Sequence, residues 1–263
     1  MSGLLRLPFL DAAPWRAAVI SPTGRYARNQ VAGMVAAGTP LVGGIALGRG
    51  GTDMDGLPLY DRIDDLPQKP NIAVIYTPAE GVRAAIAECA RAKISTIVAA
   101  AEYVPVHDAL AAVALSREAG SWLVGPNTLG IFVPGRGLLG SIAPSFCKEG
   151  RLAVIVRSGT VALALTRQLT LAGIGQRIVA HIGGDKEYAL AEAARGFVKP
   201  IIAMVVGRHA PVQKQMGHAG ALIGSARESA EAKMQALAAA GCQVAKGLEE
   251  AIAMAAELGL AVS

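Results

Sequence analysis

The chain has 263 residues, of which 52% are hydrophobic and only 4% are aromatic. This length allows one large or two ordinary α/β domains, and the many small aliphatic residues suit helix-covered sheets better than an aromatic-rich sandwich or barrel. The formal net charge is +5. The basic residues are scattered, however, so a nucleic-acid partner is not expected and small anionic ligands are favoured.

Membrane insertion and secretion are not expected either. The longest uncharged run, residues 29–48, contains several glycines and Pro40, and it predicts a helix, a turn and a buried strand instead of a membrane span. The N-terminal residues lack the pattern of a signal or transit peptide. Cys89, Cys147 and Cys242 are far apart and predict neither a disulfide framework nor a zinc site. We expect a cytoplasmic protein without a metal site.

Apolar β-branched runs alternate with Ala-rich segments of helical period along the whole chain. Between residues 80 and 94, for example, Val82, Ala85, Ile86 and Cys89 fall on one face of a helix. This alternation predicts βαβ units around a parallel sheet, whose strands are continuously apolar because both faces are covered. The strands expected in the first block are residues 17–21, 41–46, 71–76, 95–100 and 121–125.

A stretch with many Gly and Pro residues, 126–137, follows the fifth strand and predicts a domain boundary. We therefore expect a Rossmann-like domain over residues 1–130 and a second α/β domain over residues 131–263. The strands expected in the second domain are residues 152–156, 177–182, 200–206 and 242–246, with helices near residues 161–172, 229–240 and 249–258.

Two turns of the first domain are typical of anion binding. The first strand leads into Thr23-Gly24-Arg25-Tyr26, where a helix begins and its N–H groups can receive a phosphate. The second strand leads into a glycine-rich loop that carries Arg49, which suits a phosphorylated nucleotide, although the same residues also fit an ordinary surface loop. The glycine pattern and the acidic residue of a dinucleotide site are both absent, which argues against an NAD-linked dehydrogenase.

The second domain contains a similar turn and an unusual histidine. Residues 157–160, Arg-Ser-Gly-Thr, join an apolar strand to a helix and predict either a second anion-binding turn or an ordinary N-cap. His218 stands in the segment Gly-His-Ala-Gly-Ala, whose small neighbours leave the imidazole open to a phosphoryl group. A loop histidine packed for shape is the alternative. The other histidines lack this glycine frame, and we expect structural or surface roles for His107, His181 and His209.

These motifs occur in the order that is found in a known family. The matching segments are Thr23-Gly24, Val42-Gly43-Gly44, Gly48-Arg49-Gly50-Gly51-Thr52, Gly56-Leu57-Pro58, Val74-Ile75-Tyr76, Val124-Gly125-Pro126-Asn127, Arg157-Ser158-Gly159-Thr160, Ile182-Gly183-Gly184-Asp185 and Gly217-His218-Ala219-Gly220-Ala221. From the first expected strand to the last expected helix, the chain resembles the α subunit of succinyl-CoA synthetase and its malate–CoA ligase relatives.

The resemblance implies an α/β protein with an N-terminal Rossmann-like CoA-binding domain and a flavodoxin-like ligase domain, completed by a separate ATP-grasp β subunit. That partner would bind ATP or GTP with Mg²⁺. Ser158, Gly159 and Thr160 would cradle the phosphoryl group that His218 carries. The residues implied to contact coenzyme A are Thr23, Gly24, Arg25, Tyr26, Arg49 in place of the usual lysine, Thr77, Pro78, Ala100, Ala101 and Glu102.

The implied reaction is that of an acid–thiol ligase, as in the tricarboxylic acid cycle. A nucleoside triphosphate phosphorylates His218, and the phosphohistidine passes the phosphoryl group to a carboxylate, with succinate or a related dicarboxylate expected. The sulfur of CoA then attacks the acyl phosphate and releases phosphate. Helix N-termini would stabilise the charge as it moves.

The chain departs from the family at several positions. Over residues 185–200 it lacks about 30 residues, the size of one strand–helix unit, and in the family this unit brings a glutamate that orients the histidine. Asp185, Glu187 or a partner residue would have to replace that glutamate. Leu163 stands where the family has a substrate-side tyrosine, and Thr128 stands where it has a cysteine.

The shortened segment gives a second hypothesis from another functional class. A CoA- or acyl-CoA-binding regulatory protein could keep the fold and lose phosphoryl transfer together with the missing unit. The retained Gly-His-Ala-Gly segment favours the ligase, because a binding module has no evident need for an unobstructed nucleophile.

Overall fold

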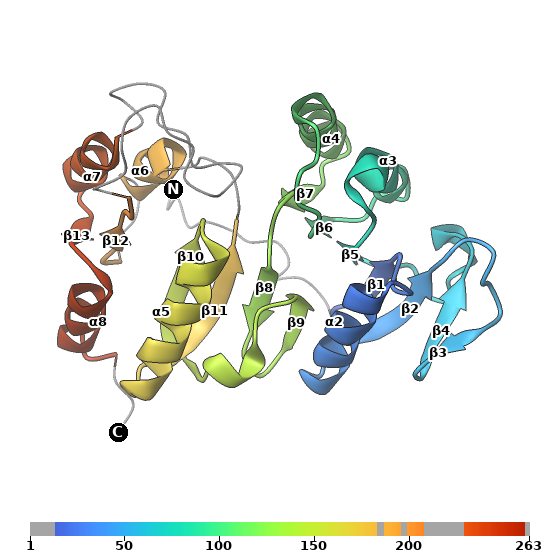
Figure 1. Cartoon of the computed structure of the whole chain (residues 1–263), viewed down its shortest axis with the longest axis horizontal. Helices are drawn as coiled ribbons and strands as arrows, with labels where there is room; N and C mark the ends of the chain where they lie inside the picture. The colour runs from blue at the N-terminus through green and yellow to red at the C-terminus, as the bar shows by residue number, and fades with distance from the viewer. Residues whose placement is uncertain (1–13, 183–186, 196–198, 208–228, 261–263) are drawn as a thin grey trace.

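The structure is a computed structural model that describes residues 14–182, 187–195, 199–207 and 229–260. Its elements form a mixed α/β fold in which three sheets follow one another along the long axis of the molecule (Figure 1). No helix in these residues combines the length and the apolar character that a membrane crossing requires.

The first sheet has seven strands in the order β3-β4-β2-β1-β5-β6-β7. All neighbours pair in parallel except β3, which pairs antiparallel with β4. The strands are β1 (Ala17–Ile20), β2 (Leu41–Ile45), β3 (Asp53–Met54), β4 (Leu57–Tyr60), β5 (Ile72–Ile75), β6 (Thr96–Ala99) and β7 (Trp122–Val124). The helices of this half are α2 (Arg25–Ala36), α3 (Val82–Arg91) and α4 (Val106–Glu118).

Alternate residues of the central strand β1 face opposite layers of this sheet. Ala18 and Ile20 pack in a core that includes side chains of α3 and α4, whereas Ala17 and Val19 pack in a core that includes side chains of α2. Both faces of the sheet are therefore covered, which explains why its strands are apolar without alternation.

The second half of the chain forms two further sheets. In the order β10-β11-β8-β9, the hairpin β8–β9 pairs antiparallel with β11, and β11 pairs in parallel with β10; β12 and β13 form a separate parallel pair. The strands are β8 (Gly130–Val133), β9 (Gly137–Gly140), β10 (Glu149–Val156), β11 (Gln176–His181), β12 (Ile202–Met204) and β13 (Gln243–Ala245). The helices are α5 (Gly159–Leu171), α6 (Glu187–Ala194), α7 (Ala230–Ala239) and α8 (Leu248–Glu257).

The hairpin β8–β9 packs on the α2 side of the first sheet and joins the two halves. Ile131 and Leu139 of the hairpin belong to the same buried cluster as Val31 and Met34 of α2. The hydroxyl of Thr39, which follows α2, donates to the carbonyl of Leu138 (2.7 Å) and accepts from its N–H (2.9 Å). One hydrophobic core therefore contains residues from both sides of position 130, where we predicted a domain boundary. That boundary stays a prediction.

The predicted fold class is confirmed, and every predicted strand and helix overlaps an element of the structure. Sequence reasoning missed both hairpins, β3–β4 and β8–β9, and the helix α6. The Gly- and Pro-rich stretch at residues 126–137, where we expected a domain boundary, contains β8 and the first residue of β9. Gly130 and Gly140 permit the close backbone approach of these two strands. The second half is also divided into two sheets. Between β11 and β12, the described residues contain α6 and no strand, in agreement with the expected loss of a unit.

Candidate functional site

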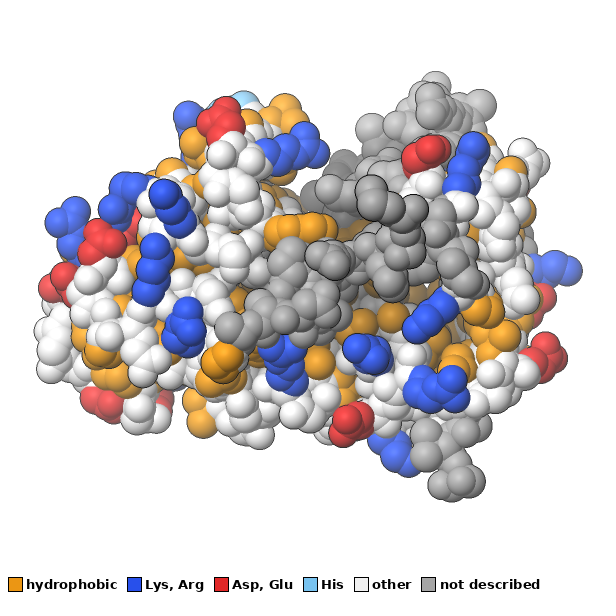
Figure 2. Space-filling view, turned by 180° about the vertical axis from the view of Figure 1, so that it is seen from behind, with side chains coloured by type: hydrophobic (Ala, Val, Ile, Leu, Met, Phe, Trp, Pro, Cys, Tyr) orange, Lys and Arg blue, Asp and Glu red, His pale blue; other side chains and the backbone are white. Residues whose placement is uncertain are grey.

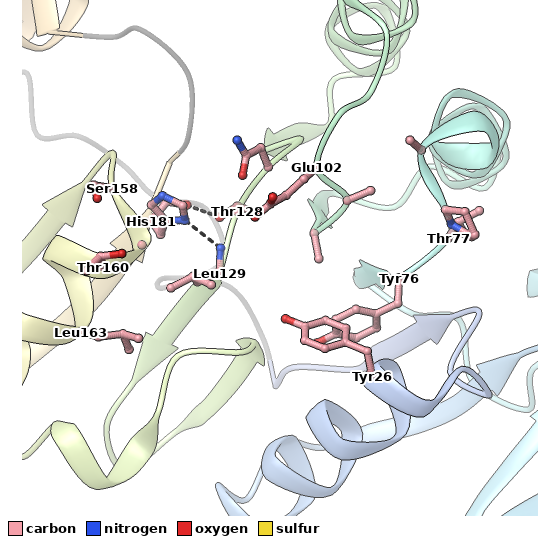
Figure 3. A pocket seen from close by; sticks show the side chains of 16 residues that line it. Tyr26, Tyr76, Thr77, Glu102, Thr128, Leu129, Ser158, Thr160, Leu163 and His181 are labelled. Carbon is pink, nitrogen blue, oxygen red and sulfur yellow. Dashed lines mark hydrogen bonds between the residues drawn. The ribbon is translucent and has the colours of Figure 1, made fainter. Parts of the chain in front are cut away.

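A cleft of about 750 Å³ opens at the carboxyl ends of the strands of the first sheet, opposite the N-terminus of α5 (Figure 3). Loops that follow parallel strands at their carboxyl ends are the usual place for a ligand in open α/β sheets. The first wall consists of residues that follow β1, β5, β6 and β7, and the second wall of residues from α5 and the end of β11. The lining residues are Tyr26, 76–79, 100–102, 127–129, 158–160, Leu163 and His181.

The N-terminus of α2 forms one corner of the first wall. Gly24 is its N-cap residue, no side chain caps the helix, and its first turn contains no acidic residue. These features suit the binding of an anion by backbone N–H groups. The ring of Tyr26 packs edge-on against that of Tyr76, with centroids 6.0 Å apart. Burial, with a smaller contribution from Tyr26, raises the pKa of the Tyr76 phenol, which therefore stays protonated.

The loops that follow β1 and β5 are joined by a hydrogen bond. The hydroxyls of Ser21 and Thr77 lie 3.1 Å apart, and Ser21 has a left-handed backbone with φ of 58°. The methyl group of Thr77 occupies space that a side chain at position 81 would need, because a Cβ on Gly81 would overlap it. Thr77, a predicted CoA contact, is therefore held by its neighbours at the edge of the cleft.

The N-terminus of α5 forms the second wall. Ser158 is its N-cap residue, and its hydroxyl accepts from the N–H of Val161 (3.4 Å). No acidic residue lies in the first turn, so the positive end of the helix remains suitable for an anion. Gly159 packs beneath Leu129, where an added Cβ would lie 3.1 Å from Cδ1 of that leucine. The two sequence interpretations of this turn, an N-cap and an anion-binding turn, are compatible.

His181 joins the second wall to residues 128–129, as Figure 3 shows. Its Nδ1 accepts from the N–H of Leu129 (2.8 Å), and its Nε2 lies 2.5 Å from the carbonyl oxygen of Arg157. The side chain is buried, with 5% of the residue exposed. We expected a structural or surface role for this histidine and did not predict that it lines the cleft. Its place at the carboxyl end of a predicted strand was the one signal available.

The structure brings most of the predicted site residues together. Among the residues that line the cleft are six predicted CoA contacts, the three predicted phosphate-binding residues and Leu163. Thr23, Gly24 and Arg25 lie in the exposed turn just before Tyr26, outside the lining. The lining residues that were not predicted as site residues are Tyr76, Ala79, Asn127, Thr128, Leu129 and His181.

Arg49 lies in a different loop, exposed between β2 and β3. The carboxylate of Asp61 accepts from the backbone N–H groups of Arg49 (3.1 Å) and Gly50 (3.0 Å). This places Arg49 at the carboxyl edge of the first sheet but not among the cleft residues. His218 and Asp185 lie outside the described residues, as does the side chain of Glu187.

The cleft can hold an extended ligand between two helix N-termini, one from each half of the chain. Among the described residues that line it, Glu102 is the only one of the types Asp, Glu, Lys and Arg, so helix ends supply the favourable potential for an anion. The walls also present aromatic and aliphatic surface from Tyr26, Leu129 and Leu163. Such a mixture suits a ligand with anionic and apolar parts.

Known proteins that resemble this chain contain a CoA-binding domain or are subunits of CoA ligases. The CoA-binding domain family matches residues 14–103. The chain is 34% identical over 270 aligned positions to the succinate–CoA ligase [ADP-forming] subunit alpha 2 of Archaeoglobus fulgidus, covering 90% of this chain and 94% of that one. It is 30% identical over 272 positions to the ADP-forming sulfoacetate–CoA ligase subunit SauD of Bilophila wadsworthia, covering 88% and 92%. The chain belongs to the family of succinate–CoA ligase α subunits.

Solved structures show the same fold in larger chains. ATP citrate lyase from Methanothrix soehngenii, in complex with citrate and coenzyme A, superposes with a TM-score of 0.79 at 19% identity, covering 95% of this chain and 51% of that one. The dinucleotide forming acetyl-coenzyme A synthetase 1 of Ca. Korarchaeum cryptofilum gives a TM-score of 0.75 at 20% identity, covering 91% and 59%. This chain spans little more than half the length of those proteins.

Proposed function

We propose that this chain is the α subunit of a cytoplasmic carboxylate–CoA ligase that forms a nucleoside diphosphate and works with an ATP-grasp β subunit. Succinate or a related dicarboxylate is the expected substrate. The observation that carries the proposal is the shared cleft: residues expected to contact CoA and residues expected to cradle a phosphoryl group line the same cavity. A ligase of this kind needs both groups within reach of one carboxylate.

Coenzyme A would enter this cleft as a substrate. The uncapped N-terminus of α2 suits one of its phosphates, and Arg25 and Arg49 are exposed near that edge of the sheet. The loops at Thr77 and at residues 100–102 would line the path of the thiol arm. This agrees with the match of residues 14–103 to the CoA-binding domain family.

The proposed reaction begins with transfer of the terminal phosphoryl group of ATP or GTP to His218. An oxygen of the substrate carboxylate then attacks the phosphorus, the P–N bond to His218 breaks, and an acyl phosphate forms. The sulfur of CoA attacks the acyl carbon and releases inorganic phosphate. In these steps the N-terminus of α5, at Ser158, Gly159 and Thr160, would stabilise the negative charge of the phosphoryl group.

The partner would bind the nucleotide and its Mg²⁺. Several relatives are named α subunits of succinate–CoA ligases, and this supports a heteromeric assembly. In this proposal the cleft of this chain would bind CoA and the phosphoryl group, and the partner would bind the nucleotide. An αβ or an α2β2 assembly would satisfy the proposal.

One observation favours a second candidate, a CoA- or acyl-CoA-binding regulatory protein. The alignment with the Archaeoglobus fulgidus α subunit has 270 positions, more than the 263 residues of this chain, so it contains positions without a counterpart here. The described residues between β11 and β12 contain α6 alone. If that loss removes the group that orients His218, CoA binding would remain and phosphoryl transfer would not.

The two candidates are separated by a labelling experiment. The chain is incubated with its ATP-grasp partner, Mg²⁺ and γ-labelled ATP or GTP, and then tested for label that is acid-labile and base-stable. We expect label on the wild type and on His107→Ala, whose histidine is exposed, and none on His218→Ala. CoA affinity should remain intact in His218→Ala. If the wild type bound CoA but took up no label, the proposal of a ligase would be overturned and that of a regulatory protein favoured.

A further inference from the structure

We propose that His181 is a positioning residue that holds the N-terminus of α5 against residues 127–129 and so fixes the separation of the two walls of the cleft. The inference rests on the proposed function, in which one wall binds CoA and the other the phosphoryl group. It assigns a role to a side chain that the proposed chemistry does not use.

The two hydrogen bonds of the ring determine its protonation. The N–H of Leu129 can only donate, so Nδ1 carries a lone pair; the carbonyl of Arg157 can only accept, so Nε2 carries the proton. His181 is therefore a neutral imidazole whose donor and acceptor are both engaged. Such a ring has no free nitrogen with which to act as a nucleophile or a general base, and this favours a positioning role.

The main chain of His181 is attached to the same segment as its side chain. The hydroxyl of Thr128 donates to the carbonyl oxygen of His181 and accepts from the N–H of Gly130 (2.8 Å). Thr128 is buried, with 4% exposed. On the other side, the N–H of Ile182 donates to the carbonyl of Val156 (2.9 Å). The end of β11 thus lies between residues 128–130 and the end of β10.

These contacts continue into both walls. The N–H of Asn127 donates to the carbonyl of Ala101 (2.8 Å), which lies beside Glu102 in the first wall. Arg157, the partner of Nε2, immediately precedes Ser158, the N-cap residue of α5. A continuous series of hydrogen bonds therefore runs from the loop after β6, through residues 127–129 and His181, to the N-terminus of α5.

The separation of the walls matters for the proposed reaction. The thiol of CoA must meet an acyl phosphate whose phosphoryl group lies at the other wall, and a misplacement of about 1 Å can lower a rate about 100-fold. Removing the His181 side chain would break the link between Arg157 and Leu129 and leave the main-chain bonds of position 181 in place. The α5 turn would then be held less firmly against residues 127–129. The expected result is a loss in turnover with little loss in CoA affinity.

Three substitutions separate the two bonds of the ring. In His181→Asn, the side-chain oxygen can take the place of Nδ1 and accept from Leu129. In His181→Gln, the side-chain nitrogen can take the place of Nε2 and donate to Arg157, and His181→Ala removes both bonds. His107→Asn, at an exposed histidine, is the matched control. Each variant of the full chain is assembled with the ATP-grasp partner.

Two quantities are measured for each variant: amide hydrogen exchange at Leu129 and at residues 158–161, and the kcat and CoA dissociation constant of the assembly. We expect exchange at Leu129 to accelerate in His181→Ala and His181→Gln but not in His181→Asn. We expect kcat to fall about 10- to 100-fold in His181→Ala, with partial recovery in His181→Asn, and the CoA dissociation constant to stay within about threefold.

Unchanged exchange at Leu129 in His181→Ala would overturn the proposal, and so would accelerated exchange with unchanged kcat. The failure of the proposed function would look different. In that case the wild-type assembly would form no acyl-CoA from any carboxylate, and amide exchange alone would test the role of His181. Faster exchange at Leu129 in His181→Ala and His181→Gln than in His181→Asn would support the positioning role, and any other order would overturn it.

Discussion

The two walls of the cleft are built in different ways. In the first wall, each lining loop follows a strand of one parallel sheet, so its position is set by local strand–helix connections. In the second wall, two features set the position of the N-terminus of α5. One is a mixed sheet whose hairpin packs on the first half of the chain, and the other is a set of hydrogen bonds between residues about 50 positions apart. The first wall is therefore encoded locally and the second by long-range contacts.

Figure 2 shows basic side chains distributed over the back of the molecule, without a single stripe.

Replacing Gly130 with alanine should give the largest loss of stability. Gly130 begins β8 with φ of 88°, and an added Cβ would overlap the carbonyl oxygen of Leu139 across the hairpin. Backbone strain and steric overlap act together, so the free energy of unfolding should fall by about 3 kcal/mol or more. Urea denaturation measures this change.

A glycine of the first half provides the control. Gly33 lies inside α2, where the nearest atom to an added Cβ is Cδ2 of Leu138 at 3.9 Å. Gly33→Ala should therefore raise the free energy of unfolding by about 0.5–1 kcal/mol, through helix propensity. If both substitutions changed the free energy of unfolding equally, the hairpin would tolerate a side chain at position 130 as well as α2 tolerates one at position 33. The expected difference in backbone constraint between the two halves would then be wrong.

Thr39→Val should give an intermediate effect, because it breaks the polar contact between the halves. The hydroxyl is buried and satisfies both the N–H and the carbonyl of Leu138. Valine leaves these groups unpaired, at a cost of about 1–3 kcal/mol in unfolding free energy. Thr39→Ser keeps the hydroxyl and should lose much less. Equal losses in the two variants would mean that packing, and not this hydrogen bond, joins α2 to β9.

The same contrast explains how much of the fold could be predicted from the sequence. The strands of the parallel sheet are runs of apolar residues between turn signals, and these patterns are local. The strands β8 and β9 contain Gly130, Gly137 and Gly140, which are turn signals unless the partner strand is known. Helix α6 (Glu187–Ala194) lies in the stretch where the resemblance implies a missing strand–helix unit, so no element was predicted there. The division of the second half into two sheets has no local signal in the sequence.

The candidate site follows a similar division. Thr77 and residues 100–102 were predicted because they match family motifs at the ends of predicted strands, and they line the cleft. Leu129 and His181 were missed because their importance lies in a hydrogen bond between positions 52 residues apart, and a lone histidine carries no sign of its partner. Arg49 was expected with the other predicted CoA contacts, yet it does not line the cleft that contains most of them.

Asp61→Asn should give the smallest effect, confined to the Arg49 loop of the first half. The carboxylate accepts from the N–H groups of Arg49 and Gly50, and an amide oxygen accepts less strongly. Amide exchange at these two residues should accelerate, and CoA affinity should fall less than about tenfold, the equivalent of one ordinary hydrogen bond. Asp53→Asn is the matched control, because Asp53 accepts from Gly56 (2.7 Å) in the next turn.

The effect of Asp61 should also depend on pH in a defined direction. The hydrogen bond from Gly50 has the largest effect and lowers the pKa of Asp61 below its ordinary value of 3.8; desolvation, the next effect in size, opposes it, and the weaker effects of the hydrogen bonds from Gly48 and Arg49 add to the lowering. A lowered folded-state pKa means that the stabilisation is complete above the unfolded-state value and is lost as the pH falls through the folded-state value. The difference in exchange between the wild type and Asp61→Asn should therefore be constant near neutral pH and shrink below pH 3.8. A difference in exchange that grew on acidification would contradict the inference that the ionised Asp61 carboxylate stabilises the Arg49 loop.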